Sequence, residues 1–85
     1  MQQAFTTIQQ ILAEKTAINV EDIFPETHLE AELGIDLEDD LPGIIGRVNR
    51  QFGVRLSADE VFANLEAVPT VGRLSQLVQD ELDLG

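Results

Sequence analysis

The chain has 85 residues, of which 44% are hydrophobic and 25% charged, so we expect one small domain spanning 1–85 with no room for a deep enclosed active site. Sixteen acidic residues against five basic ones give a net charge of −11, which argues against binding to nucleic acid or to anionic membranes. Cysteine is absent, so disulfides and thiolate metal sites are excluded.

The start of the chain and its apolar runs point to a cytoplasmic protein. No apolar run approaches the roughly 20 residues that a membrane-spanning helix needs. The stretch 1–15 lacks the basic start and long apolar core of a signal peptide. The acidic residues suit a basic protein partner, and the alternative is that they only keep the chain soluble.

The first two helical patterns cover 2–16 and 40–52. In the first, hydrophobic residues recur at helical spacing on one face. In the second, a continuous apolar stripe is formed by Leu41, Ile44, Ile45, Val48 and Phe52. Pro42 is tolerated in a first helical turn, and Gly53 is a natural helix end.

Two further helices follow in the C-terminal part of the chain. Ser57 and Glu60 have the spacing of a capping box and open a short helix to about residue 66. Pro69 then breaks the chain, and Thr70 can cap a last helix carrying an apolar stripe to residue 82. No segment alternates like a strand. We therefore predict an all-α, small four-helix bundle of three longer helices and one short one.

The first connection, 17–38, is long for so small a domain. It carries scattered apolar residues, so we expect it to pack on the bundle; these are Ile18, Val20, Ile23, Phe24, Leu29 and Leu33.

Three stretches resemble the acyl carrier protein family, including peptidyl and polyketide carrier domains. They are IFPETHLEAELGID at 23–36, IIGRVNRQFGV at 44–54 and PTVGRL at 69–74. Their order and spacing are fairly specific for the carrier fold, and the resemblance extends over about residues 8–82. It implies a protein that catalyses nothing itself and presents cargo to synthase enzymes.

The resemblance also implies a prosthetic group that this sequence does not accommodate in the usual way. Carriers hold 4′-phosphopantetheine on a serine in an Asp-Ser-Leu motif at the start of the second helix. Here Asp36 is followed by Leu37, and alignment backward from Phe52 places Glu38 at the serine position instead, because this chain is about one residue longer there. No serine or threonine lies between Thr27 and Ser57. We therefore expect no such cofactor.

Acidic residues crowd the same helix start. Glu38, Asp39 and Asp40 would repel a phosphodiester, and we expect one of them to cap the helix. Ser57, as a helix cap, and Ser75, which we expect on the solvent side of the last helix, are weak alternative attachment sites.

Other kinds of site find little support. Asp36, Glu38 and Asp40 alternate like the start of a calcium loop, but the positions that need glycine and glutamate hold Leu41 and Arg47. We expect no metal site. A single loop histidine, His28, has no serine partner in the motif region, so we predict a surface or local hydrogen-bonding role and no enzyme activity.

The exposed face of the second helix carries Gly43, Gly46, Arg47 and Arg50 after the acidic residues Asp39 and Asp40. In carriers this face is often acidic. Glycine inside a helix costs about 1 kcal/mol relative to alanine. Two interpretations remain: close packing against the long loop, or close approach of a partner protein or a second copy of the chain.

Three functional hypotheses follow. The first is a non-catalytic docking or regulatory protein in fatty-acid, polyketide or nonribosomal-peptide synthesis, whose partner is a synthase or transferase enzyme. The second is a working acyl or peptidyl carrier with a variant attachment site. The third is a small acyl-ligand-binding protein that shelters an acyl chain among its helices. The sequence leaves a homodimer open.

Overall fold

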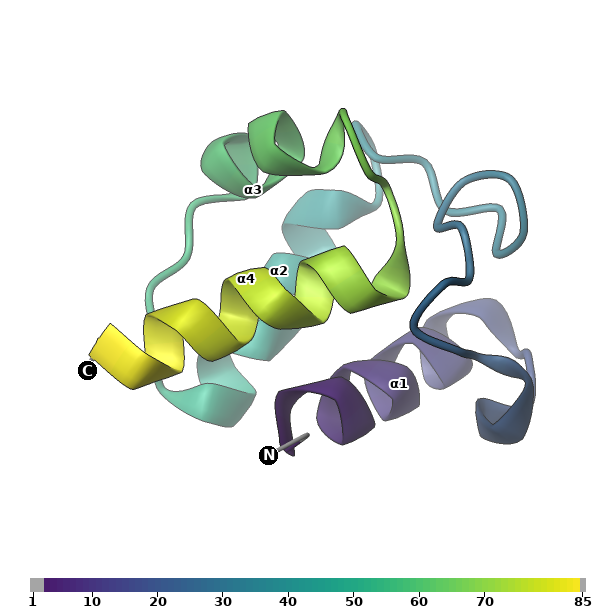
Figure 1. Cartoon of the computed structure of the whole chain (residues 1–85), viewed down its shortest axis with the longest axis horizontal. Helices are drawn as coiled ribbons and strands as arrows, with labels where there is room; N and C mark the ends of the chain where they lie inside the picture. The colour runs from purple at the N-terminus through teal and green to yellow at the C-terminus, as the bar shows by residue number, and fades with distance from the viewer. Residues whose placement is uncertain (1–2, 85) are drawn as a thin grey trace.

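The computed structural model describes residues 3–84, and within them the chain is all-α (Figure 1). The helices, in chain order, are α1 (Gln3–Thr16), the 3-10 turn η1 (Val20–Asp22), α2 (Leu41–Phe52), α3 (Ala58–Leu65) and α4 (Val71–Leu84). The predicted bundle of three longer helices and one short one is confirmed. The predicted start of the first helix at residue 2 lies outside the described residues. None of the described helices is long and apolar enough to cross a membrane.

The helices pack around one apolar core. The α1 helix lies against α4 and α2, while α3 closes the far side against α2 and α4. Figure 1 shows α4 in front of α2, with α1 and α3 on opposite sides of the pair. Fully buried side chains from α1, α2 and α4 meet there, among them Ile8, Leu12, Val48, Leu74 and Val78.

The long first loop packs on this bundle, as predicted, but Val20 and Phe24, which were expected to pack with it, are exposed. Ile23 and Leu29 are completely buried, and Leu33, Ile35 and Leu37 join the same core. The loop passes from α1, through η1, across the end of the bundle to the start of α2 (Figure 1). Its burial fixes where the residues before α2 point.

Backbone hydrogen bonds attach the loop to the entry of α4. Gly72 N–H donates to Pro25 O at 2.7 Å, and Val71 N–H donates to Thr27 O at 3.0 Å. In the opposite direction, Leu29 N–H donates to Pro69 O at 2.8 Å. Two of the three stretches that resemble carriers, 23–36 and 69–74, are therefore joined directly.

The predicted helix ends are also confirmed. The hydroxyl of Ser57 accepts from Glu60 N–H at 3.4 Å, and that of Thr70 accepts from Arg73 N–H at 3.2 Å. Gly53 ends α2 in the left-handed conformation, at φ 69°, where its N–H donates to Asn49 O.

Candidate functional site at the start of α2

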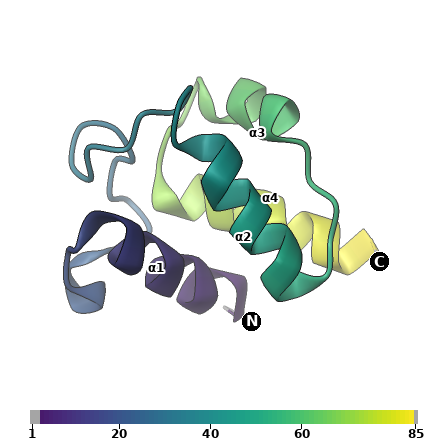
Figure 2. The same ribbon diagram turned by 180° about the vertical axis from the view of Figure 1, so that it is seen from behind.

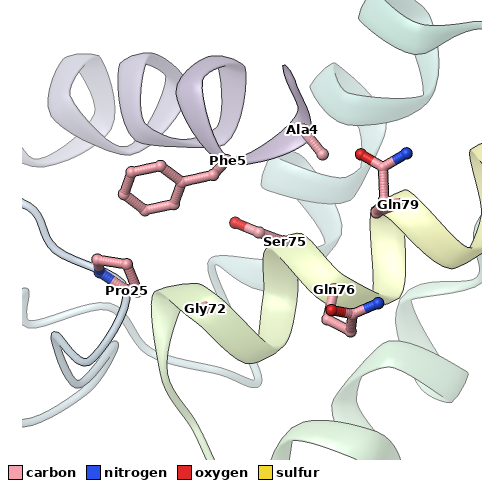
Figure 3. Close-up of a pocket in the computed structure, with 7 residues that line it drawn as sticks. All are labelled: Ala4, Phe5, Pro25, Gly72, Ser75, Gln76 and Gln79. Carbon is pink, nitrogen blue, oxygen red and sulfur yellow. The ribbon is translucent and has the colours of Figure 1, made fainter. Parts of the chain in front are cut away.

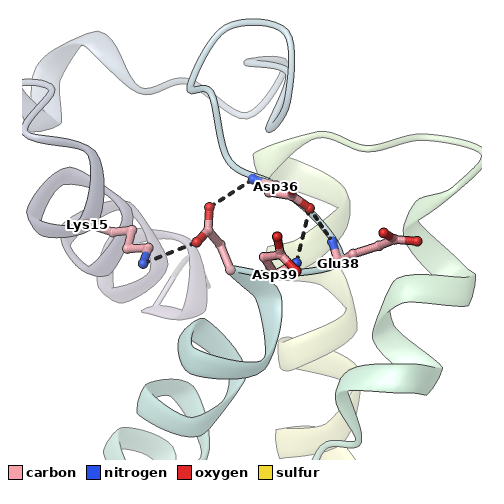
Figure 4. A network of polar contacts seen from close by, with 5 residues as sticks. Lys15, Asp36, Glu38 and Asp39 are labelled. Carbon is pink, nitrogen blue, oxygen red and sulfur yellow. Dashed lines mark hydrogen bonds and ion pairs between the residues drawn. The ribbon is translucent and has the colours of Figure 1, made fainter.

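A network of carboxylates organises the chain just before α2 (Figure 4). The Asp36 Oδ1 atom accepts from Glu38 N–H at 2.8 Å and from Asp39 N–H at 3.0 Å. In return, Asp40 Oδ2 accepts from Asp36 N–H at 2.9 Å, and Asp40 N–H donates to Asp36 O at 2.7 Å. The four residues 37–40 thus form a helical turn that leads into α2.

The residue that caps this turn is not the one expected. We predicted a cap from Glu38, Asp39 or Asp40, and this is wrong, because the capping carboxylate belongs to Asp36. Asp40 has helical backbone angles and makes no side-chain bond to the following N–H groups. Asp36 precedes the turn, so its side chain reaches the free N–H groups two and three residues ahead.

The two residues considered for the serine position point in opposite directions. Leu37 is only 5% exposed and belongs to the hydrophobic core. Glu38 and Asp39 are exposed on the surface. Position 37 therefore faces the interior, and position 38 is the first surface position after Asp36.

An ion pair connects the network to α1. Lys15 Nζ lies 3.4 Å from Asp40 Oδ1 (Figure 4). The hydrogen bond from Asp36 N–H lowers the pKa of Asp40 below its usual value of 3.8, while burial opposes this and the charge of Lys15 lowers it further. Asp40 is therefore ionised throughout the neutral range.

Replacing Asp40 by asparagine should lower the stability of the protein at neutral pH and have less effect in acid. Since the pKa is lower in the folded chain than in the unfolded chain, the carboxylate stabilises the fold above its usual pKa. This contribution is lost as the pH falls through the lowered pKa. Urea unfolding of both proteins at about pH 7 and about pH 3 measures it. A difference that persists unchanged at the lower pH would contradict this assignment.

The alternative serines are both engaged in the fold. Ser57 is exposed and caps α3. Ser75 was expected on the solvent side of α4, and this is wrong, because it is 7% exposed and its hydroxyl donates to Val71 O at 2.9 Å. The residue lines a hollow of about 340 Å³ between α4 and the start of α1 (Figure 3). Figure 3 shows Phe5 of α1 on the facing side of this hollow.

The glycines of α2 do not serve close packing. A Cβ atom added at Gly43 would meet nothing within 4 Å, and one added at Gly46 would meet only the Arg50 side chain at 3.7 Å. The proposed packing against the long loop is therefore wrong. Cβ atoms added at these two positions would meet no atom of the long loop.

The basic residues of α2 differ in their surroundings. Arg47 Nη2 lies 2.6 Å from Glu14 Oε1 of α1, in a largely exposed pair. Arg50 is exposed and forms no ion pair with any described residue. Of the basic side chains predicted for recognition, Arg50 is thus the one without an intramolecular counter-charge.

His28 has a local structural role. Its Nδ1 atom accepts from Ala31 N–H at 3.0 Å, which confirms the predicted hydrogen-bonding role in the loop. Among residues 3–84, no three His, Asp or Glu side chains lie close enough together to hold a metal ion.

One feature of the site was not predicted from the sequence. A shallow hollow of about 230 Å³ lies beside Glu38, between the start of α2 and α3. It is lined mainly by apolar side chains: Leu37, Leu41, Pro42, Ala58 and Phe62, with Glu38 and Asp59 at its polar edge. Nothing in the spacing of the α3 residues indicates that they meet the start of α2.

Comparisons with known proteins agree with the fold. No family model matches the chain. The acyl carrier protein of Saccharopolyspora erythraea is 33% identical over 76 residues, which cover 89% of this chain and 75% of that protein. Acyl carrier proteins are non-catalytic carriers of 4′-phosphopantetheine that interact with synthase enzymes. With this similarity, the packing of α1 on α4 and the long loop after α1, the chain belongs to the acyl carrier protein family.

Proposed function

We propose that this chain is an acyl-carrier-protein-like protein that lacks the usual attachment serine. It acts as a non-catalytic docking or regulatory partner in fatty-acid, polyketide or nonribosomal-peptide synthesis, and residues 1–85 form one carrier-like domain. The observation that carries this proposal is the absence of any serine or threonine between Thr27 and Ser57. The core position of Leu37 and the surface carboxylate of Glu38 support it.

The electrostatics at the start of α2 support the loss of the prosthetic group. A helix N-terminus attracts an anion through its free N–H groups and its dipole. Here Asp36 already accepts from two of those N–H groups. The adjacent carboxylates of Glu38, Asp39 and Asp40 would repel a phosphodiester at short range. The site is thus occupied by the protein's own negative charges.

The remaining recognition surface lies on α2. We place it on Asp39 and Asp40 at the helix start and on Gly43, Gly46, Arg47 and Arg50 along the helix. The acids suit a basic patch of a synthase or transferase, while the arginines suit an acidic one. A partner that contacts both ends of α2 must therefore carry both charges in a fixed order.

The direct test uses coenzyme A and a broad-specificity phosphopantetheinyl transferase, followed by intact mass measurement. The acyl carrier protein of Saccharopolyspora erythraea serves as the comparison protein in the same reaction. We expect no mass gain for this chain, because the candidate position offers no hydroxyl. A stoichiometric gain would overturn the proposal, and peptide mapping to Ser57 or Ser75 would then establish a carrier with a variant attachment site.

The hollow beside Glu38 favours one second candidate, the binding of a free acyl ligand. Its apolar lining and its position between α2 and α3 suit one end of an acyl chain, although it is small and open. Thermal unfolding with added fatty acids and acyl thioesters tests this. A concentration-dependent rise in the midpoint supports ligand binding, and no response leaves the docking function.

A further inference from the structure

One exposed stripe of α2 carries opposite charges at its two ends. Asp39, Gly43, Gly46 and Arg50 are spaced by four, three and four residues, so they lie on one side of the helix. The turn at 37–40 continues into α2, because Ile44 N–H donates to Asp40 O at 3.2 Å. The stripe therefore has an acid at its start, glycines in the middle and a base at its end.

Among the helices of residues 3–84, none lies over α2 on the side that Figure 2 shows. In Figure 2, α2 lies toward the viewer and in front of α4, with α1 and α3 to either side. Asp39, Gly43 and Arg50 are exposed, and Gly46 is half-buried. Neither Asp39 nor Arg50 forms an ion pair with another described residue.

We propose that a second copy of this chain docks on the stripe, with the two α2 helices antiparallel about a two-fold axis. If the axis passes midway between Gly43 and Gly46, each of these glycines faces the other in the second copy. The same symmetry places each Arg50 opposite the Asp39 of the other copy. One surface thus supplies both halves of the interface, and it forms an ion pair at each end.

This arrangement explains why glycine occupies positions 43 and 46, which the packing of the single chain does not explain. Nothing lies within 4 Å of an added Cβ at Gly43, so alanine would fit there and favour the helix. Without Cβ atoms, two helix backbones can approach closely once the Arg50 side chain, which lies 3.7 Å from an added Cβ at Gly46, turns toward Asp39 of the other copy. Beside Gly43, a hollow of about 240 Å³ between α1 and α2 is lined by Ile11, Lys15, Ile44 and Arg47, and a side chain of the second copy would enter it.

The charge of the whole chain limits the strength of this association. Each copy carries a net charge of −11, which opposes dimerisation. Helix 41–52 itself contains no acidic residue, so the local contact avoids that repulsion. A single pair of short helices buries less area than a standard interface. We therefore expect a weak dimer that forms reversibly as concentration rises.

Sedimentation equilibrium from micromolar to millimolar concentration tests this with the full chain. For the wild type, the average mass should rise from 9.4 kDa toward twice that value. The single variants R50D and D39R place like charges opposite each other, and each should weaken association about tenfold or more. The double variant R50D with D39R restores opposite charges and should recover the wild-type mass curve.

Matched controls separate this effect from net charge and from folding. R55D and E30R change the net charge as R50D and D39R do, but they lie outside the stripe, so their mass curves should follow the wild type. The variant G43Q with G46Q should remain helical by circular dichroism and lose association. A wild type that is monomeric throughout, or single variants that associate normally, would overturn the proposal and leave the stripe to another protein.

This inference is independent of the missing attachment serine. A monomeric wild type in sedimentation would not change the conclusion from the coenzyme A experiment. A mass gain in the coenzyme A experiment would not change the conclusion about dimerisation. If both proposals hold, self-association buries Asp39, Gly43, Gly46 and Arg50. Dimerisation then regulates docking, because other partners would bind the same surface.

Discussion

Replacing Leu37 by serine should lower the free energy of unfolding by about 3 kcal/mol, within the range for removing a buried leucine. Leu37 is 5% exposed and packs in the core, so the variant leaves a cavity and buries a hydroxyl. Urea unfolding followed by circular dichroism measures the loss. A serine placed directly after Asp36 would therefore cost stability and remain out of reach of a transferase.

The matched control is serine at the next position. Glu38 is exposed, and only its backbone N–H takes part in the Asp36 cap. Its replacement by serine should change the stability by no more than about 0.5 kcal/mol. Equal losses for the two variants would contradict the inward direction of Leu37. The pair of variants thus tests which of the two residues occupies the surface position after Asp36.

Replacing Gly72 by alanine should lower the free energy of unfolding by about 2 kcal/mol, as expected for overpacking. An added Cβ would lie 2.9 Å from Pro25 O and 3.3 Å from Pro25 Cβ. Pro25 O also accepts the Gly72 N–H, so the loop cannot retreat without losing that bond. We expect the loop to detach partly from the entry of α4, which amide hydrogen exchange at Val71 and Leu29 would report.

The same substitution in α2 should have the opposite effect. Gly43 has no neighbour within 4 Å of an added Cβ, so alanine there should raise the stability by about 0.5–1 kcal/mol through helix propensity alone. Both variants are compared by urea unfolding in dilute solution, where the chain is monomeric. A gain in stability for Gly72→Ala would show that the contact with Pro25 is not tight.

The proposed function assigns to this chain a carrier fold whose attachment region has changed its chemistry. The loop still holds the entry of α4 through Pro25, Thr27 and Leu29, and the helix start is still capped by an aspartate. In the proposed function, what differs is the group presented there, a carboxylate at Glu38 in place of the family's serine hydroxyl. This difference underlies the proposed change from carrying cargo to being recognised.

The helical architecture follows from local patterns in the sequence. Apolar residues at helical spacing gave the helices, and Gly53, Ser57 and Thr70 gave their ends, because capping depends on residues within one turn of each other. The resemblance to carriers could also be recognised from the sequence, since each of its motifs is a short contiguous stretch. The loop 17–38 was expected to pack on the bundle from its apolar content, and it does.

The directions in which the critical side chains point depend on tertiary packing. Two alignments left Leu37 and Glu38 equivalent, and the burial of the loop turned Leu37 inward and Glu38 outward. Asp36 is the capping residue because an additional turn, 37–40, precedes α2, and the free N–H groups of that turn lie within reach of its carboxylate. Ser75 became buried because α4 turns that side toward the start of α1. Each outcome depends on how distant segments pack together, and the spacing of residues along one segment does not contain that information.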